Sequence, residues 1–154
     1  MDVYKRLEEL SIVLPESPTP KGLYTPVVEF GDKFLYTSGA GSIKNGELIY
    51  TGKVGQDVSL EQGQSAARQC MLNLLSNLHK YLGDLNKIKR ITKILAFVAS
   101  DDNFHKQALV VNGASEILIR IFGEERGKAA RTAVGVNVLP GNQPVEIEMI
   151  VELK

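Results

Sequence analysis

An arginine and two glutamates stand out in the last strand-forming part of the chain. Residues 131–153 read RTAVGVNVLPGNQPVEIEMIVEL, in which Arg131, Glu146 and Glu148 interrupt a run of residues that favour burial. A guanidinium held on a sheet offers a rigid pair of donors that matches a carboxylate or a phosphate. Two carboxyl groups on one strand face can work as an acid and a base, because burial and mutual repulsion raise their pKa values. Two plainer alternatives stay open, an ion pair between Arg131 and a nearby glutamate and a solvated face for the two glutamates.

The elements that must position these side chains predict a two-layer α+β domain. Alternating apolar residues predict two strands within 24–39, joined by a tight turn at Gly31-Asp32, and a second turn at 44–47. Helical spacing predicts one helix from the capping-box residue Ser59 to Gly83 and another from about 104 to Gly123, capped by Asp101 or Asp102. Strands are predicted at 91–99, at about 130–138 and at 145–153. The order ββ, α, β, α, ββ predicts a mixed sheet with both helices packed on one face.

A separate arm precedes this domain. Apolar residues recur at helical spacing within 2–12, and the three prolines at 15, 18 and 20 then impose an extended link. We therefore expect an N-terminal helical arm and Pro-rich link at 1–21 and one domain at 22–154.

Composition limits the possible functions. Apolar residues make up 44% of the 154 residues, and Lys+Arg and Asp+Glu are 18 each, so neither disorder nor a nucleic-acid partner is expected. No long apolar run or leader is evident, which favours a soluble cytoplasmic protein without a membrane partner. Cys70 is the single cysteine, and His79 and His105 are the only histidines, so no metal site is predicted. The place of Cys70 on an apolar helical stripe favours a buried structural thiol.

The last two strands lead to a first hypothesis about the site. If they form a simple hairpin with Val138 opposite Val145, Arg131 and Glu146 share the face away from the helices but lie roughly 20 Å apart. They would not meet within one chain. A site that uses both side chains should then be assembled from two subunits.

The chain also resembles a known family. The segments ARTAVGVNVLP and PVEIEMI are similar to the C-terminal signature of the reactive intermediate deaminase (Rid) family, also called YjgF-like or L-PSP endoribonuclease-like proteins. Three further stretches agree in order, GLYTPVVEFGDKFLYTSG, QDVSLEQGQSAARQCMLNLLSNL and AFVASDDNFHKQALVVNGASEIL, so the resemblance runs from Gly22 to Leu153. It implies a chorismate-mutase-like fold of the bacillus type, a homotrimer, and ligand sites in the clefts between subunits. The N-terminal arm and the longer spacing between Asn112 and Arg131 resemble a longer subgroup.

The resemblance also implies an activity and its residues. Relatives hydrolyse reactive enamines and imines, such as 2-aminoacrylate, to 2-keto acids and ammonia without a cofactor. By the match of motifs, Arg131 and Glu146 would be the catalytic residues, with Arg131 also binding the substrate carboxylate. The substrate-binding residues would further include Tyr24, Ser38, Gly39 and Asn112. Asn112 reads equally well as a plain helix-surface amide, and Ala133 stands where relatives often carry cysteine. A non-catalytic keto-acid-binding trimer is the alternative, and an endoribonuclease a weaker one.

Overall fold

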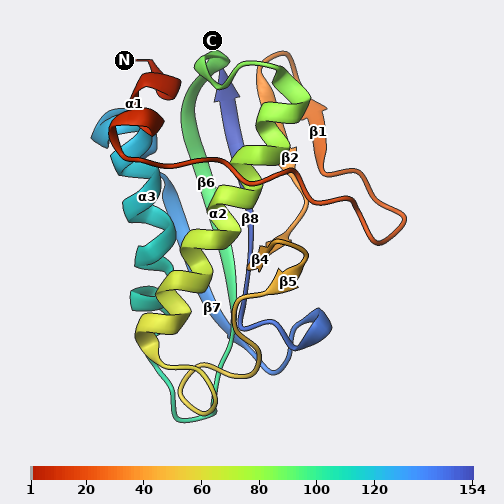
Figure 1. Ribbon diagram of the computed structural model, residues 1–154, viewed down its shortest axis with the longest axis vertical. Coiled ribbons are helices and arrows are strands. Elements are labelled where there is room, and N and C mark those ends of the chain that lie inside the picture. The colour runs from red at the N-terminus through yellow and green to blue at the C-terminus, as the bar shows by residue number, and fades with distance from the viewer. Residues whose placement is uncertain (1) are drawn as a thin grey trace.

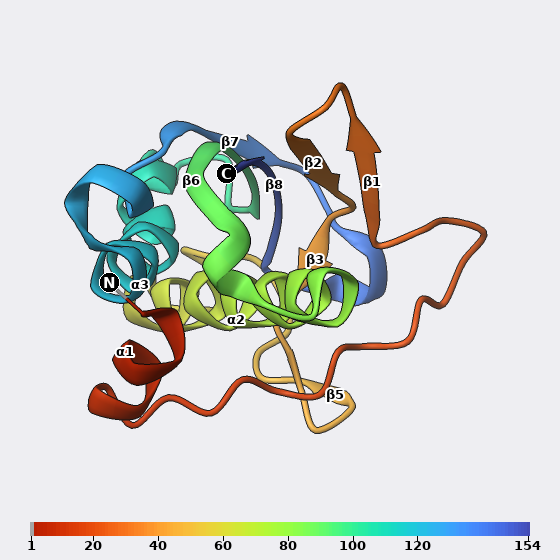
Figure 2. The same cartoon turned by 90° about the horizontal axis from the view of Figure 1, so that it is seen from above.

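Two long helices lie across one face of a mixed β-sheet, and the opposite face is left open (Figures 1 and 2). This architecture is seen in a computed structural model that describes residues 2–154. The helices are α1 (Val3–Glu9), α2 (Leu60–Leu82) and α3 (Gln107–Gly127), with short 3-10 turns η1 (Leu85–Lys87) and η2 (Pro140–Asn142). The strands are β1 (Val27–Phe30), β2 (Phe34–Thr37), β3 (Ala40–Gly41), β4 (Ile43–Lys44), β5 (Glu47–Leu48), β6 (Ile88–Ala99), β7 (Ala130–Val136) and β8 (Val145–Leu153). The predicted α+β class with two helices on one face is confirmed.

The strand order differs from the simple hairpin expected at the end of the chain. The sheet runs β1-β2-β8-β6-β7, with β3 also paired to β8. Strand β6 lies between β7 and β8, parallel to the first and antiparallel to the second. The segment 137–144 carries the chain around the end of β6, where Ser100 N donates to Val136 O and Ala99 N to Pro144 O. The hairpin prediction was wrong because it assumed that strands adjacent in sequence must also pair.

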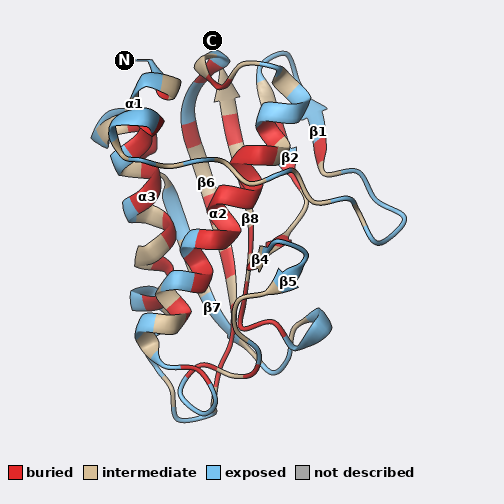
Figure 3. Cartoon of the chain, viewed as in Figure 1, coloured by how far each residue is buried: buried red, intermediate tan, exposed pale blue. Residues whose placement is uncertain are grey.

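The core fills the space between the sheet and the two helices. Every second residue of β8 is buried against them, starting at Val145 and ending at Val151, and β6 contributes Ile94, Ala96 and Val98 to the same layer (Figure 3). The other parity of each strand faces the open side, where Glu146 lies opposite Phe97. The alternation therefore assigns each strand residue to one of the two faces.

Helix α2 begins and ends where its sequence predicts. Ser59 and Gln62 form the full capping box, and Gly83 ends the helix with a left-handed backbone at φ 72°. The start of α3 was predicted wrongly, since Lys106 precedes the first turn and neither aspartate caps it. Asp101 instead accepts from the backbone N–H of Asn103, a local turn that competes with helix capping.

The N-terminal segment packs on the helical layer. Val3 and Leu7 of α1 are buried, and Val3 N donates to Asn86 Oδ1 at 2.9 Å. The link that follows crosses α2, where Ser76 Oγ donates to Pro15 O at 2.6 Å. Beyond it, the loop before β1 projects from the body of the molecule (Figure 2). Within residues 2–154, no helix is both long enough and apolar enough to cross a membrane.

Gly113 lets the two long helices touch. A Cβ atom built at this position would lie 2.1 Å from the backbone oxygen of Gln64 on α2. No rotamer change can relieve a clash with backbone, so any side chain here would push the helices apart. Overpacking of this kind destabilises by about 1–3 kcal/mol, which outweighs the gain of about 1 kcal/mol in helix propensity from replacing glycine.

We therefore expect Gly113→Ala to lower the midpoint of thermal unfolding, despite alanine's better helix propensity. Glu116→Ala, one turn further along α3 at an exposed position, is the matched control and should leave the midpoint nearly unchanged. A Gly113→Ala variant that melts at or above the wild-type temperature would contradict the close packing of α2 against α3.

Candidate functional site

Arg131 is an exposed arginine at the edge of the sheet, held by neutral partners. Its Nη1 donates to Asn112 Oδ1 at 2.9 Å and to Ser115 Oγ at 3.1 Å, both on α3. Among residues 2–154 it forms no ion pair, so the acidic-partner alternative is wrong for this chain. The Nη2 and Nε groups make no hydrogen bond within the described chain. That edge of the guanidinium presents two nearly parallel donors of the kind that fit a carboxylate.

Arg131 lies on the helix side of the sheet, which corrects the expected placement. Its register partner on β6 is Ile94, a buried residue of the helix-facing layer. Ala133 and Gly135 follow on the same side, and Ala133 packs against the core. The expectation that Arg131 shares a face with Glu146 rested on the hairpin pairing and was wrong for that reason. Because β7 is the edge strand, Arg131 still reaches solvent from this side.

Glu146 is a half-buried carboxylate on the open face. Gln143 Nε2 donates to its Oε2 at 2.6 Å, and its Oε1 lies against Gly39, where an added Cβ would be only 2.2 Å away. Burial raises the pKa of Glu146, the hydrogen bond from Gln143 lowers it, and the charge of Glu148 raises it further. The net effect is a pKa above the usual glutamate value, which suits a group that exchanges protons near neutral pH.

Glu148 does not pair with Glu146 directly. Its Oε1 accepts from the hydroxyl of Tyr36, and this bond is the main cause of a raised pKa for Tyr36. The two carboxylates are therefore separately partnered. Glu148 acts on Glu146 through its charge.

Gly39 lies against Glu146, and Ser38 beside it is bonded to the loop that carries Tyr24. Ser38 follows β2 and donates through Oγ to Thr25 O at 2.6 Å, which ties down the loop that carries Tyr24. The side chain of Tyr24 is 52% exposed. Ser38 and Gly39 adjoin each other, and Gly39 touches Glu146. Tyr24 thus belongs to the same region through its loop.

The structure divides the predicted residues into two groups. Arg131 and Asn112 form the first, and Glu146, Ser38 and Gly39 form the second, together with the loop of Tyr24. The register of Arg131 with Ile94 and of Glu146 with Phe97 separates their backbones by three residues and two strand spacings, about 14 Å. They also lie on opposite faces of the sheet.

Sequence patterns missed two polar partners of these groups. Ser115, which is three residues after Asn112, shares its helix face, and this spacing is the signal that would have found it. Gln143 lies in the turn before β8, where no periodicity marks its orientation. Each donates to or accepts from a residue that the motifs did identify.

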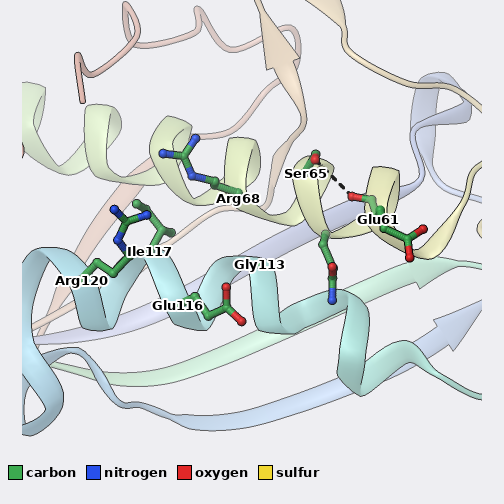
Figure 4. Close-up of a pocket in the computed structure, with 8 residues that line it drawn as sticks. Glu61, Ser65, Arg68, Gly113, Glu116, Ile117 and Arg120 are labelled. Atoms are coloured by element: carbon green, nitrogen blue, oxygen red, sulfur yellow. Dashed lines mark hydrogen bonds between the residues drawn. The ribbon is translucent and has the colours of Figure 1, made fainter. Parts of the chain in front are cut away.

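Two other features, a buried cysteine and a polar groove, contain none of the predicted site residues. Cys70 is fully buried, and desolvation raises its pKa well above the usual thiol value, so it is a structural thiol as predicted. A polar groove of about 340 Å³ lies between α2 and α3, where Arg68 and Arg120 point away from the sheet and Glu61 and Glu116 supply the opposite charge (Figure 4). None of the predicted site residues lines it.

Residues 2–154 contain no cluster of three or more metal-ligating side chains.

Comparison with known proteins decides the family. The family model described as "YjgF/chorismate_mutase-like, putative endoribonuclease" matches residues 5–153. The chain belongs to this family. The YjgF-like assignment made from the motifs is therefore confirmed.

Relatives and solved structures agree with this assignment. Protein TCP17 of Trypanosoma cruzi is 39% identical over 151 residues, which are 98% of this chain and 94% of that protein. The crystal structure of Atu1372 from Agrobacterium tumefaciens, a protein of unknown function, is 41% identical with a TM-score of 0.88, over 98% of this chain and 91% of that one. A protein from Shewanella oneidensis is 29% identical with a TM-score of 0.94 and covers 99% of this chain and 100% of its own.

In this YjgF-like protein, ionised Glu146 should destabilise the fold. Because its pKa is raised in the native state, the native state holds the proton more tightly than the unfolded chain does. The stability linked to this proton is therefore present at acid pH and is lost as pH rises through the folded pKa. Glu146→Gln mimics the protonated form and should raise the thermal midpoint at neutral pH, with a smaller gain at acid pH.

Thermal unfolding across a pH series, at fixed protein concentration, measures this linkage. The exposed Glu116→Gln is the matched control and should shift the midpoint little at any pH. A lower midpoint for Glu146→Gln than for wild type at neutral pH would show that the native state does not raise the pKa of Glu146.

Proposed function

We propose that this protein hydrolyses reactive enamine and imine intermediates of amino acids to 2-keto acids and ammonia, in a cleft between the subunits of a homotrimer. The observation that carries the proposal is the Arg131 guanidinium, which neutral partners hold at one nitrogen while its other donors stay open. Family membership supports a Rid-like function at the level of the family.

The division of the site into two groups supports a site shared between chains. Within one chain, Arg131 and Glu146 lie on opposite faces of the sheet and cannot hold one small molecule. A neighbouring copy can bring its Glu146 group beside the Arg131 edge of the first. The repeated contact between two different surfaces closes into a ring when three copies are related by rotation.

The open face of the sheet supplies a surface for that contact. It exposes apolar side chains along β1, β2 and β7, with Val28, Phe30, Tyr36 and Val134 each between 37% and 50% exposed. These exposed apolar side chains lie toward both edges of the open face, since the strand order is β1-β2-β8-β6-β7. We expect the open faces of three copies to bury them, as a protein interface does.

The chemistry requires no covalent intermediate. Arg131 would hold the substrate carboxylate and fix the position of the neighbouring imine carbon. Glu146 of the adjacent chain would take a proton from water as the water oxygen bonds to that carbon. Glu146 would pass that proton to the imine nitrogen, which completes the carbinolamine. Glu146 would then take the hydroxyl proton as the carbonyl forms and pass it to the nitrogen, so that the C–N bond breaks and ammonia leaves. Tyr24, Ser38, Gly39 and Asn112 would line the cleft, and Glu146 carries the proton between the two steps.

A protein of similar fold suggests a first ligand to test. E. coli TdcF has a TM-score of 0.66 and 20% identity over 90% of this chain, and its crystal structure contains bound serine. Serine is an amino acid with the carboxylate that Arg131 would require. At this identity the likeness shows the fold alone, so serine is a first ligand to try here.

A trapping assay tests the proposal. A serine dehydratase generates 2-aminoacrylate, and semicarbazide traps the imine that remains. The wild-type protein should reduce the trapped product, whereas an equal amount of an unrelated protein should not. No reduction would reject hydrolysis. Arg131-dependent thermal stabilisation by pyruvate or 2-ketobutyrate without hydrolysis would instead support the keto-acid-binding alternative.

A further inference from the structure

The amide of Gln143 is the direct neighbour of the carboxylate proposed to move the proton. We propose that Gln143 is a positioning residue that favours the ionised form of Glu146 and fixes which of its two oxygens meets the ligand. This inference rests on the proposed function for its catalytic meaning. The effect of the buried Gln143 amide on the pKa and orientation of Glu146 depends only on the geometry of the chain.

The contact is short and buried. Gln143 Nε2 donates to Glu146 Oε2 at 2.6 Å, and Gln143 is only 8% exposed. An amide nitrogen can only donate and a carboxylate can only accept, so this pairing favours the charged form. Since Oε2 is occupied, Oε1 is the oxygen left without a partner in the described chain. It is therefore the one placed to accept a proton.

Two glycines make room for this pair. A Cβ at Gly41 would lie 1.8 Å from Gln143 Oε1, and one at Gly39 would lie 2.2 Å from Glu146 Oε1. Both side chains therefore pack directly on the backbone around β3. Neither can move toward that backbone, which limits the positions open to the amide and the carboxylate.

The backbone around Gln143 is held on both sides. Gly52 N donates to Asn142 O at 2.8 Å, and Ala99 N donates to Pro144 O at 2.9 Å. The amide is thus carried by a turn that is fastened to two other segments. A donor held in this way loses little conformational freedom when it binds the carboxylate.

The Gln143 donor opposes the other influences on the charge of Glu146. Glu148 repels the ionised form from the same strand, and Cys70, beneath the sheet, is a neutral thiol. The register partners on β3 and β6 are Gly41 and Phe97, which carry no charge. Among these neighbours, Gln143 is the group that stabilises the carboxylate against burial and against Glu148.

A titration of the wild-type protein tests the inference without any variant of Gln143. The side-chain carboxyl of Glu146 and the side-chain N–H₂ of Gln143 are followed together by NMR as pH changes, with Glu146→Gln as the assignment reference. Both signals should shift with one common midpoint, and the Gln143 shift should vanish in Glu146→Gln. A Gln143 amide that does not respond to ionisation of Glu146 would overturn the inference.

Replacement of the amide then measures its effect. Gln143→Met keeps the volume and removes the donor, so the pKa of Glu146 should rise and the acidic limb of the kcat/KM profile should move to higher pH. On that limb kcat/KM should fall about tenfold, as for loss of one charge-assisted hydrogen bond, with near wild-type activity at alkaline pH. Gln69→Met, which removes another buried amide that does not contact Glu146, should leave the profile in place.

The outcomes separate this inference from the proposed function. A rise in the pKa of Glu146 in Gln143→Met, measured by NMR in a protein that hydrolyses no imine, would retain the inference about Gln143 and reject the proposed reaction. An unchanged pKa, or an equal loss of kcat/KM at every pH, would overturn the inference even in an active enzyme.

Discussion

Replacement of Arg131 by alanine is expected to lower kcat/KM for an imino acid by about a hundredfold or more. The variant loses two charge-assisted hydrogen bonds to the substrate carboxylate, and each is worth about 1.5–3 kcal/mol, or about tenfold or more in rate. The loss should appear in KM and in kcat together, because the guanidinium both binds the substrate and fixes the reacting carbon. The semicarbazide assay with a defined imine source measures it.

The controls separate charge from geometry at this position. Arg131→Lys keeps the positive charge but not the planar pair of donors, so most of the loss should persist. Arg68→Ala removes an exposed arginine from the outer groove of α2 and should have wild-type activity. An Arg131→Ala variant as active as wild type would remove the basis of the proposed site.

Loss of one support of the guanidinium should have a smaller effect. Arg131 Nη1 is shared between Asn112 and Ser115, so Ser115→Ala leaves the other hydrogen bond in place. We expect a decrease of a few fold in kcat/KM, mainly through KM, in keeping with about 1 kcal/mol for one hydrogen bond. The contrast with Arg131→Ala shows whether the reaction depends mainly on the guanidinium or on the side chains that hold it.

A mixture of two inactive variants is expected to regain about a quarter of wild-type activity, if each site of a cyclic trimer takes Arg131 from one chain and Glu146 from the next. Arg131→Ala and Glu146→Gln chains are unfolded together in equal amounts and refolded. About three quarters of the random trimers are then mixed, and each mixed ring contains one site with both residues intact. The physical reason is the placement of the two residues on opposite faces of one chain's sheet.

Two control refolding experiments accompany the mixture. Each variant refolded alone should stay inactive, and a refolded mixture of the Arg131→Ala variant with the double variant should also stay inactive. Recovery only in the first mixture supports a site shared between chains. No recovery, in mixed trimers verified by mass, would contradict a site that takes Arg131 and Glu146 from neighbouring chains.

The local elements of this protein follow from its sequence. The capping box at Ser59, the glycine stop at Gly83 and the turn at Gly31-Asp32 each depend on neighbours a few residues away, and all are confirmed. The family also follows from the motifs, and the residue types of the site, Arg131 and Glu146 above all, are present in the sequence regardless of how the strands pair.

The tertiary structure decided where those residues point. Alternation along a strand assigns side chains to two faces but does not say which strand lies beside which, and the insertion of β6 between β7 and β8 placed Arg131 on the helix side. The tertiary structure also identified the partners Ser115 and Gln143. Local patterns are set by interactions between near neighbours in the chain, whereas strand order is set by how the whole sheet packs against its helices, which no short stretch of sequence encodes.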